Sequence, residues 1–266
     1  HERFLGMLGM HGTYQANMSM HNADLIIAIG ARFDDRITNT PKLFAPNAKI
    51  IHLDVDYSSV SKIIEANIAV FGQVKNSLLE MIKLLEAKKD LIDPKKILPW
   101  KEQISDWKSQ HGLNHEMHLC ETDDKPIMPQ AVVQHIYNIT NGKAFITSDV
   151  GQHQMFAAQY YHFDEPRKWI NSGGLGTMGF GLPAAMGAKL AYPNDEVICI
   201  TGEGSIQMCI QELSTCTQYN LPIKIININN EALGMVKQWQ DMNYGGRHSA
   251  STYPVSYTHL TLPTMS

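Results

Sequence analysis

Two short polar segments, each following an apolar run, carry the residue types of a metal-bound phosphate site. Gly202-Glu203-Gly204-Ser205 follows the run 196–201, and Asn229-Asn230 follows the run 221–228. Both runs are typical of buried parallel strands, and the segment between them, 206–219, has helical character. Because neighbouring parallel strands end at one edge of a sheet, we expect a carboxylate and a carboxamide to meet there.

These oxygen-bearing side chains fit a hard divalent cation that bridges a diphosphate. Mg²⁺ keeps an octahedral shell of oxygen ligands and shares it with phosphates. The glycines let backbone N–H groups approach the phosphates, and Ser205 adds a hydroxyl. For the tetrapeptide alone, we favour a strand-turn-helix in which Glu203 caps a helix N-terminus. The asparagine at the end of the second apolar run favours the metal site instead.

Composition limits the class of protein. The 266 residues are 44% hydrophobic and 18% charged, as in a globular protein with one large or two ordinary domains. A net charge of −4 without a Lys/Arg stripe argues against nucleic acid as the principal partner. The four cysteines have no C-x-x-C spacing, which favours reduced thiols and a cytoplasmic location. No apolar run approaches the ~20 residues of a membrane span, and no signal peptide is visible.

The first part of the chain, residues 1–90, alternates strands and helices. Residues 24–30 and 49–56 are expected strands that end in glycine or acid, and 77–88 carries a helical apolar stripe. This pattern predicts half of a doubly wound sheet. Residues 91–125 are polar and predict a linker with a short helix near Trp100 and Trp107.

A second α/β unit, residues 126–255, is expected to follow. A helix over 131–139 leads into a strand over 144–149, and then come the two strands described first. The predicted fold class is therefore α/β, with two doubly wound parallel-sheet domains, both partial. The chain opens without an initiator methionine, so we expect a fragment, and residues 256–266 follow no period, as in a non-native tail.

Two more segments of the second unit could bind a ligand. Residues 149–154 follow a strand, where Gln152 and His153 could donate to phosphate oxygens, although a lone histidine more often caps a helix. Residues 173–181 contain a G-x-G-x-x-G spacing, but 169–172 are too short and polar to be the strand that a dinucleotide fingerprint needs. We favour glycines that let a flat heteroaromatic ring lie on the backbone, with Met178 as its apolar support.

Taken together, these segments resemble the large catalytic subunits of acetolactate (acetohydroxyacid) synthase, a thiamine-diphosphate-dependent enzyme family. The resemblance rests on 150–154, 173–179, 202–205 and 234–240, and it extends to about residue 255. In the first half, residues 8–12, 22–24 and 30–36 resemble the FAD-binding middle domain of that family. The chain departs from the family at Glu203 and Gln73, where aspartate is usual.

The resemblance implies roles for individual residues. Thiamine diphosphate would be held by Val150, Gly151, Gln152, His153, Gly176, Met178, Gly204 and Ser205. The Mg²⁺ ligands would be Glu203, Asn230 and the carbonyl of Ala232. FAD would contact His11, Gly30, Arg32, Asp35, Asp54 and Val74. The catalytic residues would be Arg36, which pairs with a keto-acid carboxylate, together with Met178, Met235 and Trp239. The alternative for Met235 and Trp239 is packing on a helix face.

The activity that the resemblance implies is carboligation. Pyruvate, decarboxylated on thiamine diphosphate, would join pyruvate or 2-ketobutyrate in branched-chain amino-acid biosynthesis. The implied assembly is a homodimer or tetramer with a possible regulatory small subunit, and no nucleic acid or membrane takes part. Since the family's activating glutamate belongs to a domain upstream of His1, the fragment alone should be inactive. The alternatives are an enzyme of the pyruvate oxidase or glyoxylate carboligase type, and a non-catalytic cofactor-binding module.

Overall fold

The computed structural model describes residues 3–113 and 126–252, which form two compact units. Contacts divide the chain into His1–Asn114 and His115–Ser266. The predicted non-native tail, 256–266, lies outside the described residues. Within the described ranges, no helix combines the length and apolar character needed to cross a membrane.

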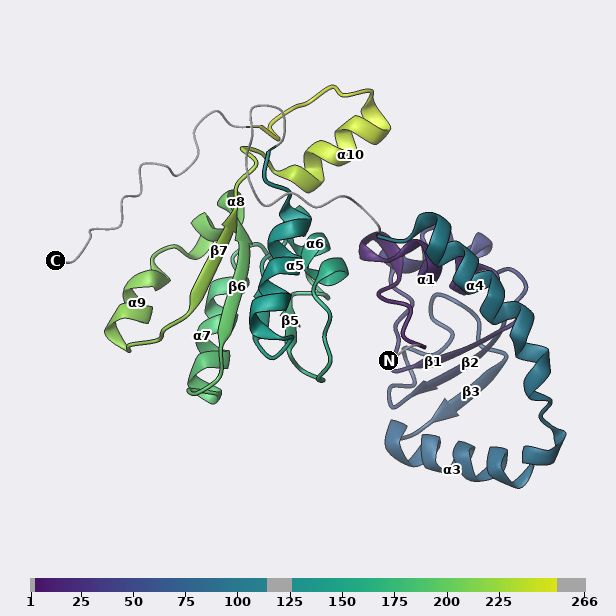
Figure 1. The fold of residues 1–266 in the computed structure, drawn as a ribbon. Coiled ribbons are helices and arrows are strands. Elements are labelled where there is room, and N and C mark those ends of the chain that lie inside the picture. The colour runs from purple at the N-terminus through teal and green to yellow at the C-terminus, as the bar shows by residue number, and fades with distance from the viewer. Residues whose placement is uncertain (1–2, 114–125, 253–266) are drawn as a thin grey trace. The chain divides into compact units, whose positions relative to one another are not determined.

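The first unit is built on a three-stranded parallel sheet in the order β1-β2-β3 (Figure 1). The strands are β1 (Leu25–Ile29), β2 (Lys49–Asp54) and β3 (Ile68–Phe71), with Ile27 paired to Ile51 and Leu53 to Val70. The helical elements are η1 (Gly9–His11), α1 (Tyr14–His21), α2 (Asp35–Thr38), η2 (Pro41–Leu43), α3 (Val74–Ala87), η3 (Lys89–Leu91), η4 (Pro94–Ile97) and α4 (Leu98–His111).

Buried and exposed residues alternate along β1, so one face of this sheet packs against a hydrophobic core. Ile26 and Ala28 are buried together with Phe33, Ala45 and Ile50. Side chains at the alternate positions of β1 are exposed, because successive residues of a strand point to opposite faces.

Helix α4 occupies part of the segment predicted as a linker, and it lies next to α1. The rings of Tyr14 and His111 are 4.1 Å apart between centroids, and Trp100 and Trp107 form an edge-to-face pair within α4. Residues 98–111 therefore fold with the first unit. The domain bounds at residues 90 and 126 stay predictions.

The second unit contains a four-stranded parallel sheet in the order β5-β4-β6-β7. The strands are β4 (Phe145–Ser148), β5 (Trp169–Asn171), β6 (Val197–Gly202) and β7 (Lys224–Ile228). The helical elements are α5 (Pro129–Thr140), α6 (Gln152–Tyr160), α7 (Gly181–Ala191), α8 (Glu203–Ile206), η5 (Gln207–Cys209), α9 (Glu212–Gln218) and α10 (Gly234–Tyr244). Figure 1 shows α7 and α9 on one side of this sheet and α5 and α6 on the other.

One core cluster of the second unit lies between the sheet and α7. Phe145, Val197 and Cys199 pack against Leu182 and Ala185, and each of these residues is almost fully buried. All six residues of β6 are buried, which explains why its sequence is a continuous apolar run rather than an alternating one. The predicted α/β class with two parallel sheets is confirmed.

Three local expectations from the sequence differ from the structure. The helix expected over 206–219 is divided into α8, η5 and α9. Strand β5 directly precedes the glycine-rich segment, so the interpretation that no strand stands there is wrong. Its three residues are only half-buried at the edge of the sheet, which explains their weak apolar pattern. Strand β3 was not predicted, because its four residues are largely exposed.

Candidate functional site

A cavity opens at the carboxyl edge of the second sheet. Strand β4 pairs with β5 on one side and with β6 on the other, so the chain changes direction across the sheet at this point. Ligands of open α/β sheets bind at such a switch point, outside the carboxyl ends of the strands. The cavity has a volume of about 810 Å³. Its lining includes every residue of the second unit predicted to bind cofactor or metal: Val150, Gly151, Gln152, His153, Gly176, Met178, Glu203, Gly204, Ser205, Asn230 and Ala232.

The two side chains expected to bind metal meet at one backbone amide. The Ala232 N–H donates to Glu203 Oε1 at 3.0 Å and to Asn230 Oδ1 at 3.2 Å. Both oxygens therefore lie at the same edge of the sheet. The distance between them cannot exceed the sum of the two hydrogen-bond lengths. Glu203 is 2% exposed, so its carboxylate is directed into the protein rather than into solvent.

The predicted metal ligands, Glu203, Asn230 and the Ala232 carbonyl, are not a cluster of acids and histidines. Among residues 3–113 and 126–252, no three His, Cys, Asp or Glu side chains gather as a metal site. A carboxylate, a carboxamide and a carbonyl are hard oxygen donors, and such a set suits Mg²⁺ that also binds phosphate.

Glutamine side chains fix the orientation of Asn230. Its Nδ2 donates to Gln152 Oε1 at 3.2 Å, and Gln152 Nε2 donates to Gln238 Oε1 at 3.0 Å. This chain of hydrogen bonds turns the carbonyl oxygen of Asn230 toward Glu203. Gln238, on α10, was not predicted as a site residue, because a polar residue on a helix has no distinguishing pattern in sequence.

Two glycines leave the room that this network needs. A Cβ at Gly234 would overlap Gln152 Oε1 and would come within 2.5 Å of Asn230 Nδ2. A Cβ at Gly202 would lie 2.8 Å from the Nδ1 atom of His153. A side chain at Gly234 would therefore displace Gln152 or Asn230, and one at Gly202 would displace the His153 ring.

His153 is a neutral, buried ring that lacks a partner on one nitrogen. Burial lowers its pKa to about 4, although a hydrogen bond to the Asp149 backbone acts in the opposite direction. Within the described part of the chain, its Nε2 atom has no hydrogen-bond partner. An unpartnered buried nitrogen on the wall of a cavity is costly unless a ligand contacts it.

The remaining predicted residues of this unit line the same cavity, with one exception. Ser205 donates its hydroxyl to the Val150 carbonyl at 2.9 Å, which joins the start of α8 to the end of β4. Met178 and Met235 line the cavity, whereas Trp239 is 52% exposed and is not one of the described lining residues. The structure thus brings Met235, but not Trp239, to the cavity wall.

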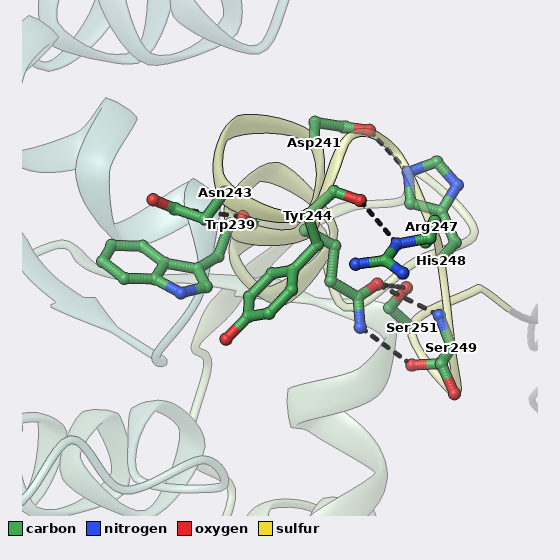
Figure 2. Close-up of polar contacts among 9 residues, drawn as sticks. Trp239, Asp241, Asn243, Tyr244, Arg247, His248, Ser249 and Ser251 are labelled. Carbon is green, nitrogen blue, oxygen red and sulfur yellow. Dashed lines mark hydrogen bonds and ion pairs between the residues drawn. The ribbon is translucent and has the colours of Figure 1, made fainter.

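The segment after α10 folds back toward the loop that contains Ala232. Gln240 bonds to the backbone of Ser249 in both directions and accepts the Ser251 hydroxyl at 2.7 Å, and Asp241 contacts His248 (Figure 2). The Leu233 N–H then donates to the Ser251 carbonyl at 2.8 Å. These contacts support the loop that contains Ala232.

In the first unit, the residues predicted to contact FAD follow the ends of the strands. Gly30 follows β1, Asp54 ends β2, and Val74 begins α3 after β3. The Gly30 N–H donates to the Leu53 carbonyl, which extends the pairing of β1 with β2 by one residue. These three positions share the carboxyl edge of the sheet.

The other predicted residues of the first unit lie in η1, in α2 and in the loop before α2. Arg32 forms an ion pair with Asp34, whose carboxylate also accepts the Arg36 N–H and caps the helix that Asp35 begins. Burial, and then the charge of Arg36, lower the pKa of His11. Arg36 belongs to a different unit from Met178, Met235 and Trp239.

Known proteins resemble this chain over both units. Residues 1–81 match the central domain of thiamine pyrophosphate enzymes, and residues 149–262 match their C-terminal TPP-binding domain. Thiamine pyrophosphate is another name for thiamine diphosphate. The acetolactate synthase large subunit of Buchnera aphidicola subsp. Schlechtendalia chinensis is 58% identical over 251 residues, or 94% of this chain and 43% of the relative.

Two further relatives give the same result. The acetolactate synthase isozyme 3 large subunit of Escherichia coli K12 is 55% identical over 94% of this chain and 43% of its own length. Acetolactate synthase 1, chloroplastic, of Nicotiana tabacum is 43% identical over 95% of this chain and 37% of its own length. The chain thus spans less than half the length of these relatives. It belongs to the acetolactate synthase large-subunit family of thiamine pyrophosphate enzymes.

Proposed function

We propose that the chain binds thiamine diphosphate and Mg²⁺ in the cavity of its second unit. The observation that supports this most is the shared contact of Glu203 and Asn230 with the Ala232 amide. The metal ligands would be Glu203 and Asn230 with the carbonyl of Ala232. The longer stem of glutamate fits this site, because its Oε1 atom already reaches the loop after β7.

The diphosphate would lie against the ends of β4 and β6. Its contacts would be Val150, Gly151, Gln152, His153, Gly204 and Ser205, and the unpartnered Nε2 atom of His153 supports this. Gly176 and Met178 would contact the aminopyrimidine ring, and Met235 would lie on the thiazolium side. When bound, thiamine diphosphate supplies the electron sink that decarboxylation of a 2-keto acid requires. The chain contributes placement and exclusion of water.

For the first unit we propose FAD as the ligand. The carboxyl edge that contains Gly30, Asp54 and Val74 supports a nucleotide site, with Asp54 near ribose hydroxyls. His11, Arg32 and Asp35 complete the proposed contacts. Gln73, at the N-cap of α3, makes no side-chain capping bond there, and its amide would take the place of the usual aspartate.

The whole protein, on this proposal, is an acetolactate synthase. The names of the relatives support the synthesis of acetolactate. The proposed reaction is the condensation of pyruvate with pyruvate or 2-ketobutyrate in the synthesis of isoleucine and valine. Arg36 and Trp239 would contact the keto acids. The term "large subunit" in those names supports a regulatory small subunit, and a homodimer or tetramer is the proposed assembly. The three described cysteines are free thiols, which favours the cytoplasm as its location.

A chimera tests the activity. The 251 matched residues would replace their counterpart in the Escherichia coli large subunit, and acetolactate formed from pyruvate would be measured as acetoin after acid decarboxylation. We expect activity within about tenfold of the parent enzyme. Peroxide or acetyl phosphate as product would favour an enzyme of the pyruvate oxidase type. Binding of thiamine diphosphate without any turnover would favour a non-catalytic module.

A further inference from the structure

Asp149 does not line the cavity, but its buried carboxylate lies between two segments that do. Asp149, the residue after β4, is completely buried and is not one of the described residues that line the cavity. Its side chain has no assigned role in the proposed site. A buried carboxylate is costly unless hydrogen bonds satisfy its oxygens.

Each oxygen of this carboxylate accepts a hydrogen bond from a different segment. Oδ1 accepts the backbone N–H of Gly179 at 2.6 Å, and Oδ2 accepts the Thr201 hydroxyl at 3.0 Å. Gly179 belongs to the segment that contains Gly176 and Met178, and Thr201 lies two residues before Glu203 in β6. The side chain therefore connects the proposed aminopyrimidine wall to the strand that leads to the metal.

The backbone around Asp149 is fixed independently of its side chain. Its N–H donates to the Ile200 carbonyl at 3.0 Å. A Cβ added to Gly181 would lie 2.8 Å from the Asp149 nitrogen, so α7 begins close against this backbone. The end of β4 is thus a rigid support from which the carboxylate reaches the glycine-rich segment.

We propose that Asp149 is a positioning residue that holds residues 176–179 in the place where they can contact the thiamine end of the cofactor. This inference rests on the proposed binding of thiamine diphosphate. At the diphosphate end, Glu203 and Asn230 accept the Ala232 N–H and Ser205 donates to the Val150 carbonyl, and the Asp149 side chain is not a partner in these three bonds. Loss of the carboxylate should therefore affect one end of the cofactor site and spare the other.

Three substitutions separate this role from general stability. Asp149→Ala removes both bonds. Asp149→Asn can keep both, because its oxygen accepts the Gly179 N–H while its amide donates to Thr201, whose hydroxyl already lies 3.3 Å from the Gly202 carbonyl. Ser148→Ala is the matched control, since Ser148 is equally buried and donates only to the Asp149 carbonyl.

The test is calorimetric titration of the 266-residue chain with two probes in the presence of Mg²⁺. Inorganic pyrophosphate occupies only the diphosphate end, whereas thiamine diphosphate occupies both ends. We expect Asp149→Ala to weaken thiamine diphosphate at least about tenfold and pyrophosphate by less than about twofold. Asp149→Asn should restore the wild-type affinity, and Ser148→Ala should match the wild type with both probes. Equal weakening of both probes, or no weakening of either, would overturn the inference.

Hydrogen exchange without any ligand tests the same contact independently. We expect the amides of Gly176–Gly179 to exchange faster in Asp149→Ala than in Ser148→Ala, with β4 and β6 unchanged. If these amides exchange at the same rate in both variants, Asp149 does not hold the segment. If the wild-type chain binds neither probe but the exchange result is as expected, the proposed function is wrong and the structural role of Asp149 stands.

Discussion

The two units present their candidate sites in different ways. In the second unit, predicted ligands that lie far apart in sequence contact one another directly, as Asn230 does with Gln152 and Ala232 with Glu203. In the first unit, the contacts are mostly local, as between Asp34 and Arg36 or between Asp54 and the N–H of Asp56. In the second unit these contacts join distant segments, whereas in the first unit each of these contacts stays within one loop.

Burial follows the same division. Glu203, Ser205 and His153 are buried beside a large cavity. In the first unit, one face of β1 carries exposed apolar side chains, and Leu25, Ile27 and Ile29 are each more than 40% exposed. Protein side chains that are already held in place lose less conformational entropy when a cofactor binds. Single substitutions should therefore weaken cofactor binding more in the second unit than in the first.

The largest effect is expected from Glu203→Gln. The carboxamide keeps the shape of the side chain but removes the charge that would neutralise Mg²⁺. We expect Mg²⁺-dependent binding of thiamine diphosphate to weaken by about 100-fold, measured by calorimetry. Glu165→Gln is the control, because Glu165 is 57% exposed. Unchanged affinity in Glu203→Gln would remove this residue from the metal site.

The buried ring of His153 should make the stability of the second unit depend on pH. Burial lowers the pKa of His153 to about 4, below the value of about 6.5 expected in the unfolded chain. Between these values the unfolded state binds the proton, so the stability falls as pH decreases from 6.5 to 4 and is constant above 6.5. The expected loss between pH 7 and pH 4.5 is about 2–3 kcal/mol.

Urea denaturation at pH 7 and pH 4.5 measures this loss. His153→Gln should lose about 2–3 kcal/mol less than the wild type over the same interval. His135→Gln, at an exposed position of α5, controls for the substitution itself. An equal loss in wild type and His153→Gln would mean that the ring is not held neutral by burial.

A smaller effect is expected from Gly234→Ala. The added Cβ would overlap Gln152 Oε1, so the amide network that orients Asn230 must shift. We expect thiamine diphosphate to bind about tenfold more weakly. In Gly187→Ala of α7 the new Cβ meets no atom within 4 Å, and this variant should bind normally. Similar affinities of the two variants would show that the network is not required.

The smallest effect is expected in the first unit, from Asp54→Asn. Its carboxylate oxygen already accepts a local N–H, which an amide oxygen can also accept. We expect FAD binding, followed by quenching of flavin fluorescence, to weaken by only about threefold. If FAD affinity fell by about 100-fold, as expected for thiamine diphosphate in Glu203→Gln, the two units would not differ in their sensitivity to substitution.

Much of the second site could be predicted because strand ends are easy to locate. The apolar runs before Glu203 and Asn230 predict parallel strands, and parallel strands bring their carboxyl ends together. The contacts of Gln238 and Gln240 could not be predicted, since they depend on how α10 and the segment after it fold back. Asp149 was recognised only as the end of a strand, because its side-chain partners are 30 and 52 residues away in sequence.

The central claim is that Glu203, Asn230 and Ala232 bind a single ion together with a diphosphate. Its most direct test is an anomalous difference map from crystals of the chain grown with Mn²⁺ and thiamine diphosphate, since Mn²⁺ takes the oxygen ligands of Mg²⁺. We predict one strong peak within coordination distance of the Glu203 carboxylate, the Asn230 amide oxygen and the Ala232 carbonyl. A peak that contacts only one of these residues, or lies elsewhere in the chain, would contradict the claim.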